Sequence, residues 1–192
     1  MPSQIRIGGG HMITDDKDMK IAGDDFVQAQ EPDDTEATAK LLNQEKANGN
    51  LGRARRLGAI LAEDVAAVEG DRPLDATSYM TQRRILMAFA VEVGLDTYLP
   101  NPLLSQTARN IFYETMRKTS PTFYEDLQGS GAFSFYCLCV RDGRNVAICV
   151  GETFATICAK QGDEKLAKQG EDLFLRCNEQ VRLFTESMEF VH

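Results

Sequence analysis

The stretch YMTQRRILMAFAVEV, residues 79–93, decides the fold of this 192-residue chain. Its central run, Ile85 to Val91, makes a helix here apolar on nearly all sides, so we expect this helix at the centre of the core. Gly94 is expected to end it. Pro100 and Pro102 support that end, because neither can donate a backbone hydrogen bond and each disfavours helix in the residue before it.

Several flanking segments carry a helical pattern as well. In the three longer segments apolar residues recur three and four positions apart on one side, which indicates an amphipathic helix. Residues 34–47 are rich in strong helix formers instead, and residues 122–127 follow the helix-starting pair Ser120-Pro121. Capping residues stand where such helices would begin, namely Asp34, Ser120 and Asp163. The predicted helices cover residues 34–47, 52–69, 104–118, 122–127 and 163–188.

Residues 133–150 can be interpreted in two ways. Aromatic and β-branched residues on both sides of Asp142-Gly143 are typical of a β-hairpin. The same residues also fit two helices, the second with apolar positions three and four residues apart over residues 146–158, which is long for a strand. We favour the two helices because that spacing runs unbroken.

The fold class expected from these patterns is all-α. We predict a single-domain bundle of five to seven helices over residues 35–192, with an α+β fold carrying a hairpin at residues 133–150 as the alternative. Residues 12–34 are poor in large apolar groups, so a disordered acidic tail is expected there. Residues 1–11 are interpreted as a vector-encoded leader.

Composition and charge exclude several classes of protein. The chain is 43% hydrophobic and 26% charged, as globular proteins are. Its net charge is −8, and residues 1–50 hold 10 acidic against 5 basic side chains, so neither nucleic acid nor an anionic membrane is an expected partner. The longest apolar run has seven residues, whereas a membrane-spanning helix needs about 20. Without a signal peptide, the cytoplasm is the expected location.

Histidine is nearly absent from the chain. His11 and His192 are the two that occur, and both lie near its ends. Hydrolase triads, histidine acids and His-rich zinc sites need an imidazole inside a folded domain. No phosphate-binding glycine loop occurs either. The sequence therefore offers no catalytic residue and no cofactor site, which favours a binding protein over an enzyme.

Five cysteines lie in the C-terminal half, at Cys137, Cys139, Cys149, Cys158 and Cys177. Their spacing matches no zinc-finger pattern. The simplest expectation is five free thiols that pack as small apolar residues. A thiol or metal site built from Cys137, Cys139 and Cys149 would need the β-hairpin, because on a helix the first two project about 200° apart.

Two further groups of side chains are candidate contact sites. Arg83 and Arg84 could receive a carboxylate or phosphate, since arginine binds such anions in a bidentate manner. The rings of Phe112 and Tyr136 could line an adjoining apolar pocket, with core packing as the alternative. The apolar stripe of the last helix could pack in the core or form a homodimer seam. Its candidate interface residues are Phe174, Val181 and Phe184.

Part of the chain resembles the first two helices of a cyclin box. The resemblance rests on Arg84-Ile85-Leu86, Val91-Glu92-Val93 and Leu99-Pro100-Asn101. It implies a helical adaptor that binds other proteins. The lysine that a cyclin box carries in its third helix has no counterpart in residues 132–140.

These observations predict a cytoplasmic, non-enzymatic interaction or regulatory module. Its partner would be another protein or a second copy of the chain. The alternative is a thiol-dependent metal or redox protein that uses Cys137, Cys139 and Cys149.

Overall fold

The computed structural model describes residues 34–67 and 79–191. This part of the chain forms eight α-helices and contains no β-strand, so the all-α prediction is confirmed and the alternative with a β-hairpin is wrong. The number of helices exceeds the predicted five to seven. The helices are α1 (Asp34–Ala47), α2 (Asn50–Ala67), α3 (Tyr79–Tyr98), α4 (Pro102–Thr119), α5 (Pro121–Gly129), α6 (Ala132–Asp142), α7 (Val146–Ile157) and α8 (Glu164–Ser187).

The chain divides into two compact units, residues 1–38 and residues 39–192. Residues 34–38 are the described part of the first unit, and they form the start of α1. The predicted leader and nearly all of the predicted acidic tail lie outside the described residues. The second unit holds the rest of α1 and all of α2 to α8. In the described ranges, no helix is long and apolar enough to cross a lipid bilayer.

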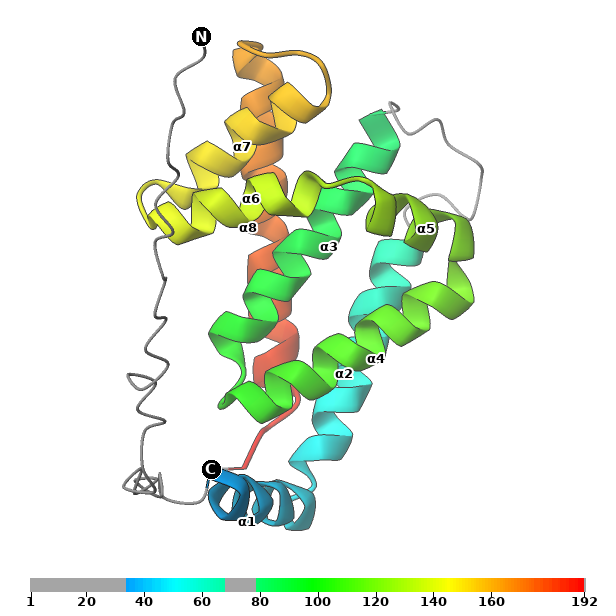
Figure 1. Ribbon diagram of the computed structural model, residues 1–192, viewed down its shortest axis with the longest axis vertical. Helices are drawn as coiled ribbons and strands as arrows, with labels where there is room; N and C mark the ends of the chain where they lie inside the picture. Colours follow the sequence, from blue (N-terminus) through cyan, green and yellow to red (C-terminus); the bar gives the residue numbers. More distant parts are fainter. Residues whose placement is uncertain (1–33, 68–78, 192) are drawn as a thin grey trace, which may run out of the picture. The chain divides into compact units, whose positions relative to one another are not determined.

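α3 is the central helix of the second unit (Figure 1), where it contacts α2 and every helix from α4 to α8. Ile85 and Phe89 are among its many buried residues, as expected. The predicted stop at Gly94 is wrong, because α3 continues to Tyr98. A Cβ atom at Gly94 would lie 2.8 Å from the Cβ atom of Val181 in α8. This glycine therefore allows α3 and α8 to pack closely, which offsets its low helix propensity.

Two other helix pairs also meet through a glycine. A Cβ atom at Gly58 in α2 would lie 2.1 Å from the carbonyl oxygen of Ala108 in α4. A Cβ atom at Gly151 in α7 would lie 2.3 Å from the carbonyl oxygen of Ala167 in α8. Any larger side chain at these positions would push the helices apart. The close pairs α2 with α4 and α7 with α8 are both visible in Figure 1.

Polar side chains set the starts of several helices. Asn101 accepts a 3.1 Å hydrogen bond from a backbone N–H and caps α4. Asp163 caps α8 in the same way, as predicted. Ser120 occupies the N-cap position of α5 and Pro121 follows it, as predicted, but the Ser120 side chain makes no capping hydrogen bond. Its hydroxyl instead accepts a hydrogen bond from Arg84.

A buried asparagine connects the start of α2 to the C-terminal end of the chain. Asn50 is fully buried, and its amide donates to the carboxylate of Glu45 at 2.6 Å and to the carbonyl oxygen of Val191 at 2.7 Å. The backbone N–H of Val191 donates back to Asn50 at 3.0 Å. Glu45 also accepts from Asn101. Because these polar groups satisfy one another, the cluster can be buried without a large desolvation cost.

Residues 133–150, for which a β-hairpin is the alternative prediction, lie in α6, α7 and the loop between them. Ala132, Tyr136 and Cys139 are buried on one side of α6, and their spacing of four and three residues suits a helix and not a strand. Gly143 and Asn145 both adopt left-handed backbone angles, with φ of 71° and 48°, and reverse the chain between the helices. The dipeptide interpreted as a β-turn therefore ends a helix.

Candidate functional site

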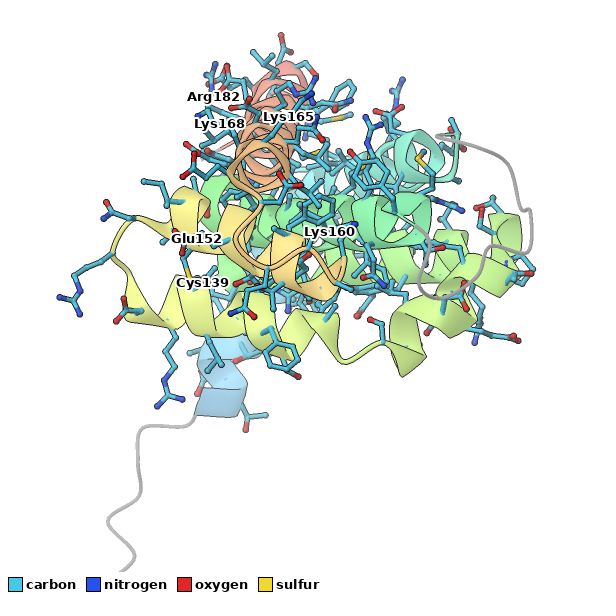
Figure 2. All side chains as sticks on the ribbon, turned by 90° about the horizontal axis from the view of Figure 1, so that it is seen from above. Cys139, Glu152, Lys160, Lys165, Lys168 and Arg182 are labelled. Atoms are coloured by element: carbon cyan, nitrogen blue, oxygen red, sulfur yellow. A yellow bond between two sulfur atoms is a disulfide. The ribbon has the colours of Figure 1, made fainter. Side chains whose placement is uncertain are left out.

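A disulfide bond joins Cys139 of α6 to Cys149 of α7, with the Cα atoms 5.5 Å apart. Figure 2 shows Cys139 between the two helices. The pairing arises because the chain reverses at Gly143 and packs α7 back along α6. The expectation of five free thiols is wrong for this pair. Two cysteines of the expected thiol or metal site meet without a β-hairpin, while the third, Cys137, stays outside the bridge. The cysteines that remain free are Cys137, Cys158 and Cys177.

Several large apolar side chains are exposed on these two bridged helices. Phe135 and Leu138 in α6 are each 59% exposed, and Ile148 in α7 is 49% exposed. Phe135 and Leu138 are three residues apart and therefore share one side of α6. Ile148 directly precedes the bridged Cys149. We call the exposed side chains of Phe135, Leu138 and Ile148 the hairpin face. Grouped exposed apolar side chains of this size are typical of a binding surface.

The helical hairpin of α6 and α7 carries no net charge. Its charged residues are Arg141, Asp142, Arg144 and Glu152, all of them exposed. Arg144 pairs with Asp142 at 3.5 Å. No charged residue occurs in residues 132–140. The hairpin is therefore a neutral and apolar element in a chain whose net charge is −8.

A hollow of about 350 Å³ lies beside the hairpin face, between α6 and the helices α3 and α4. Cys137 and Val140 line it from α6, and Glu92 and Asp96 line it from α3. Arg109 of α4 and Arg141 of α6 are the basic residues of the lining. The hollow thus combines apolar groups, two carboxylates, two guanidinium groups and one thiol.

Arg109 of this hollow is paired with the two carboxylates, Glu92 and Asp96. Arg109 contacts both Asp96 and Glu92, the latter at 3.3 Å, and the hydroxyl of Tyr113 donates to Glu92 at 3.1 Å. Burial raises the pKa of Glu92 above its usual value, although the charge of Arg109 acts in the opposite direction. These contacts hold α3 to α4. Because each carboxylate has partners, the arrangement is typical of a structural network and not of an acid–base pair.

The free thiols are poor nucleophiles. Burial raises the pKa of Cys158 and that of Cys177 to about 11. Burial, together with the negative charge of Glu92, also raises the pKa of Cys137. The reactive form of cysteine is the thiolate, which is scarce when the pKa is raised. Among the described residues, no group of three or more Cys, His, Asp or Glu side chains could hold a metal ion.

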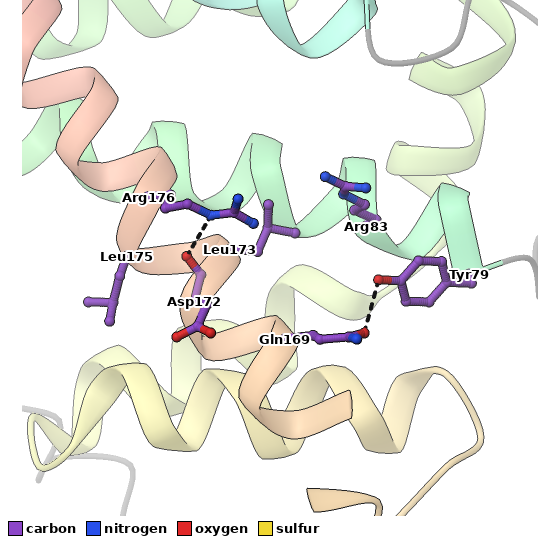
Figure 3. Close-up of a pocket in the computed structure, with 7 residues that line it drawn as sticks. All are labelled: Tyr79, Arg83, Gln169, Asp172, Leu173, Leu175 and Arg176. Carbon is purple, nitrogen blue, oxygen red and sulfur yellow. Dashed lines mark hydrogen bonds between the residues drawn. The ribbon is translucent and has the colours of Figure 1, made fainter. Parts of the chain in front are cut away.

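The four predicted ligand-binding residues do not come together. Phe112 and Tyr136 are 1% and 0% exposed and belong to the core. Arg84 is buried as well, and its guanidinium carbon lies 4.0 Å from the ring centre of Phe123. Arg83 lies apart from them and lines a cavity between α3 and α8 (Figure 3).

The residues considered for a dimer seam on α8 pack within the chain. Phe174 and Val181 are 6% and 0% exposed, and Phe184 packs against the same core. This is the core role considered in the sequence analysis. The outward side of α8 is rich in charge, as the ion pairs of Arg182 with Glu179 and Glu186 show.

The hairpin face is not among the predictions from the sequence, although residues 132–140 contain more apolar residues than one buried side of a helix can hold. Residues 132–140 are largely apolar all round, whereas a surface helix needs one apolar side. Some of these apolar residues must therefore be exposed. Tertiary packing decides which of them are exposed. The ring of Tyr136 packs against Phe89 of α3, with ring centres 5.1 Å apart, and this contact turns that side of α6 inward.

Comparison with known proteins gives no relative: no protein-family model, no curated protein and no solved structure matches the chain. The resemblance to a cyclin box gains no support from these comparisons. Function must therefore be argued from the geometry of this chain.

Proposed function

We propose that the protein is a non-enzymatic interaction module that self-associates through the hairpin face. The observation that carries this proposal is the exposure of Phe135 and Leu138, each 59%, on a helix clamped by a disulfide. Burying such side chains against a partner is favourable by roughly 25 cal/mol per Å² of apolar surface. A clamped hairpin also loses little conformational freedom when it binds.

Charge favours a second copy of the chain as the occupant of this face. Two copies with a net charge of −8 repel each other as a whole. The hairpin carries two arginines and two acidic residues, so two copies can approach through it with the least repulsion. Arg141 and Asp142 are adjacent, and a two-fold axis could place the arginine of one copy beside the aspartate of the other.

Sedimentation equilibrium without reductant tests this proposal. We expect the wild-type chain to form a reversible dimer. The double variant Phe135→Ser, Leu138→Ser should raise the dissociation constant at least about 1,000-fold, since a symmetric dimer loses four side chains and truncating each costs about 1–2 kcal/mol. Circular dichroism shows whether the variant keeps its helices.

A matched control is available on α8. Leu175 and Leu183 are 48% and 51% exposed but lie among charged side chains. The double variant Leu175→Ser, Leu183→Ser should leave the dissociation constant unchanged. A wild-type chain that stays monomeric at every concentration contradicts the proposal, and so does a control that dissociates the dimer equally well.

A redox-responsive protein is a second candidate function, which the Cys139–Cys149 bridge favours. We keep the cytoplasm as the proposed location, where disulfides are uncommon because thiols are held reduced. A bridge that opens and closes there would make the hairpin face depend on redox state. It spans a sequence separation of 10 residues, so opening it should destabilise the hairpin by about 2–3 kcal/mol.

Dithiothreitol and one serine variant test this second function. Reduced wild-type protein should dimerise as weakly as Cys149→Ser, and both should dimerise more weakly than the oxidised protein. Cys137→Ser removes a free thiol from α6 and should keep the full response to reductant. If reduction leaves the dissociation constant unchanged, this second function is excluded.

A further inference from the structure

A cavity of about 540 Å³ lies between the first turns of α3 and the first half of α8 (Figure 3). Tyr79 and Arg83 line it from α3, and Gln169, Leu173 and Arg176 are among the residues that line it from α8. Figure 3 shows the guanidinium groups of Arg83 and Arg176 on either side of Leu173. The hydroxyl of Tyr79 donates to Gln169 at 3.4 Å and closes one end of the cavity.

The two guanidinium groups are available for an anion. Among the described residues, neither Arg83 nor Arg176 forms an ion pair, and the hydrogen bond recorded for Arg176 goes to the backbone carbonyl of Asp172. The carboxylate of Asp172 also lines the cavity, but it is paired with Lys168 at 3.3 Å. The cavity therefore carries net positive charge in a chain that is acidic as a whole.

A second hollow, of about 470 Å³, adjoins the first and shares Tyr79 and Gln169 with it. Lys160 and Lys165 line this hollow, and neither forms an ion pair among the described residues. Its carboxylate, Asp163, is already engaged as the cap of α8. The positive potential therefore extends to both sides of Tyr79.

The field of the two arginines also reaches a buried thiol. Cys177 follows Arg176 on α8, and the charges of Arg176 and Arg83 both lower its pKa, although burial outweighs them and raises it to about 11. Both guanidinium groups therefore lie within electrostatic range of one side chain. This agrees with the presence of both arginines in the cavity lining.

We propose that the cavity between α3 and α8 binds a small phosphate monoester, with Arg83 and Arg176 holding the phosphate and Tyr79 and Leu173 contacting its organic part. A carboxylate needs one guanidinium for a bidentate contact, whereas a phosphate dianion has oxygens and charge for two. An aromatic ring and a leucine beside the cations suit an apolar or planar body. The site is independent of the hairpin face and goes beyond self-association.

Titration of the intact chain with phenyl phosphate, followed by isothermal calorimetry and by amide chemical shifts, tests the site. Arg83→Gln and Arg176→Gln should each weaken binding about tenfold, because each removes a charge-assisted contact. Asp172→Asn removes a carboxylate from the lining and should strengthen binding about threefold. Inorganic phosphate should shift the same amides, and benzoate should bind several times more weakly.

Arg55→Gln is the matched control, because it removes one exposed positive charge from α2, outside the cavity lining. It should leave the affinity unchanged. No shift at about 10 mM phenyl phosphate overturns the proposal. Equal weakening by Arg55→Gln overturns it too, since binding would then follow the general charge of the protein. Equal affinity for benzoate overturns the choice of a phosphate.

Discussion

Arg83 and Arg84 are neighbours in sequence with opposite surroundings. Arg83 is half-buried and faces a cavity, whereas Arg84 is 1% exposed and lies beneath α5. The guanidinium of Arg84 lies over the ring of Phe123 and donates to Ser120 at 3.2 Å. On a helix, adjacent residues point about 100° apart, so one position can face a cavity while the next holds the fold together.

Arg84→Met should therefore destabilise the protein by about 2–3 kcal/mol, because it removes the cation–π contact and the hydrogen bond to Ser120 while keeping most of the volume. Arg83→Met should change the free energy of unfolding by less than about 0.5 kcal/mol. Urea denaturation followed by circular dichroism measures both. Equal stabilities of the two variants would show that Arg84 does not anchor α5.

Glu92 predicts a pH dependence at the residue scale. Burial raises its pKa in the folded protein above the usual 4.5, so the folded state binds the proton more tightly than the unfolded chain. Its contribution to stability is greatest below pH 4.5 and falls as the pH rises through the higher folded pKa. Glu92→Gln, which cannot titrate, should therefore cost more stability at pH 4 than at pH 7.

Glu114 on α4 supplies the control of opposite sign. A hydrogen bond from Lys118 lowers the pKa of this exposed carboxyl. The cost of Glu114→Gln should thus be small at pH 4 and rise towards pH 7. Denaturation midpoints measured across this range compare the two variants. The account of Glu92 is contradicted if the cost of both variants rises with pH.

At the scale of elements, close contact through glycine determines how the helices meet. Gly58 and Gly52 lie on the same helix, α2, and differ in their surroundings. A Cβ atom at Gly58 would meet the backbone of Ala108, whereas a Cβ atom at Gly52 would have nothing within 4 Å. A substitution at Gly58 therefore tests helix packing, whereas the same substitution at Gly52 tests helix propensity alone.

Gly58→Ala should destabilise the protein by about 2–3 kcal/mol, because the added methyl group forces α2 and α4 apart. Gly52→Ala should stabilise it by about 0.5–1 kcal/mol, because alanine has the higher helix propensity. Thermal unfolding reports both changes. A stable Gly58→Ala variant would mean that α2 and α4 do not cross as closely as described.

Much of this fold follows from local pattern, and the remainder depends on long-range contacts. The helical spacing of residues 79–93 and the cap at Asp163 are visible in the sequence. The continuation of α3 through Gly94 depends on Val181, and the buried cluster of Asn50 depends on Val191, which is 141 residues away. No periodicity within a single segment reports such pairings.

The candidate sites also depend partly on local sequence pattern and partly on long-range contacts. Arg83 can be identified from the sequence as an anion ligand, but its partner Arg176 is brought close by the packing of α3 on α8. The bridge between Cys139 and Cys149 depends on α7 folding back along α6. The hairpin face is visible as an excess of apolar residues, and the inward placement of Tyr136 decides which of them remain exposed.

At the scale of the whole molecule, two regions depart from an acidic surface. The hairpin face is apolar and the hairpin behind it is neutral, whereas the cavity between α3 and α8 is positively charged. Neither feature resembles the solvated, charged surface that covers the outward side of α8. We propose self-association through the first region and binding of a small anion in the second.

The central claim is that the hairpin face is the contact between two copies of the chain. Isotope-filtered nuclear Overhauser spectroscopy on an equimolar mixture of labelled and unlabelled oxidised protein tests it most directly. The account predicts intermolecular signals from the ring of Phe135 and the methyl groups of Leu138 and Ile148. A spectrum without intermolecular signals, or with signals confined to Leu175 and Leu183 of α8, would contradict it.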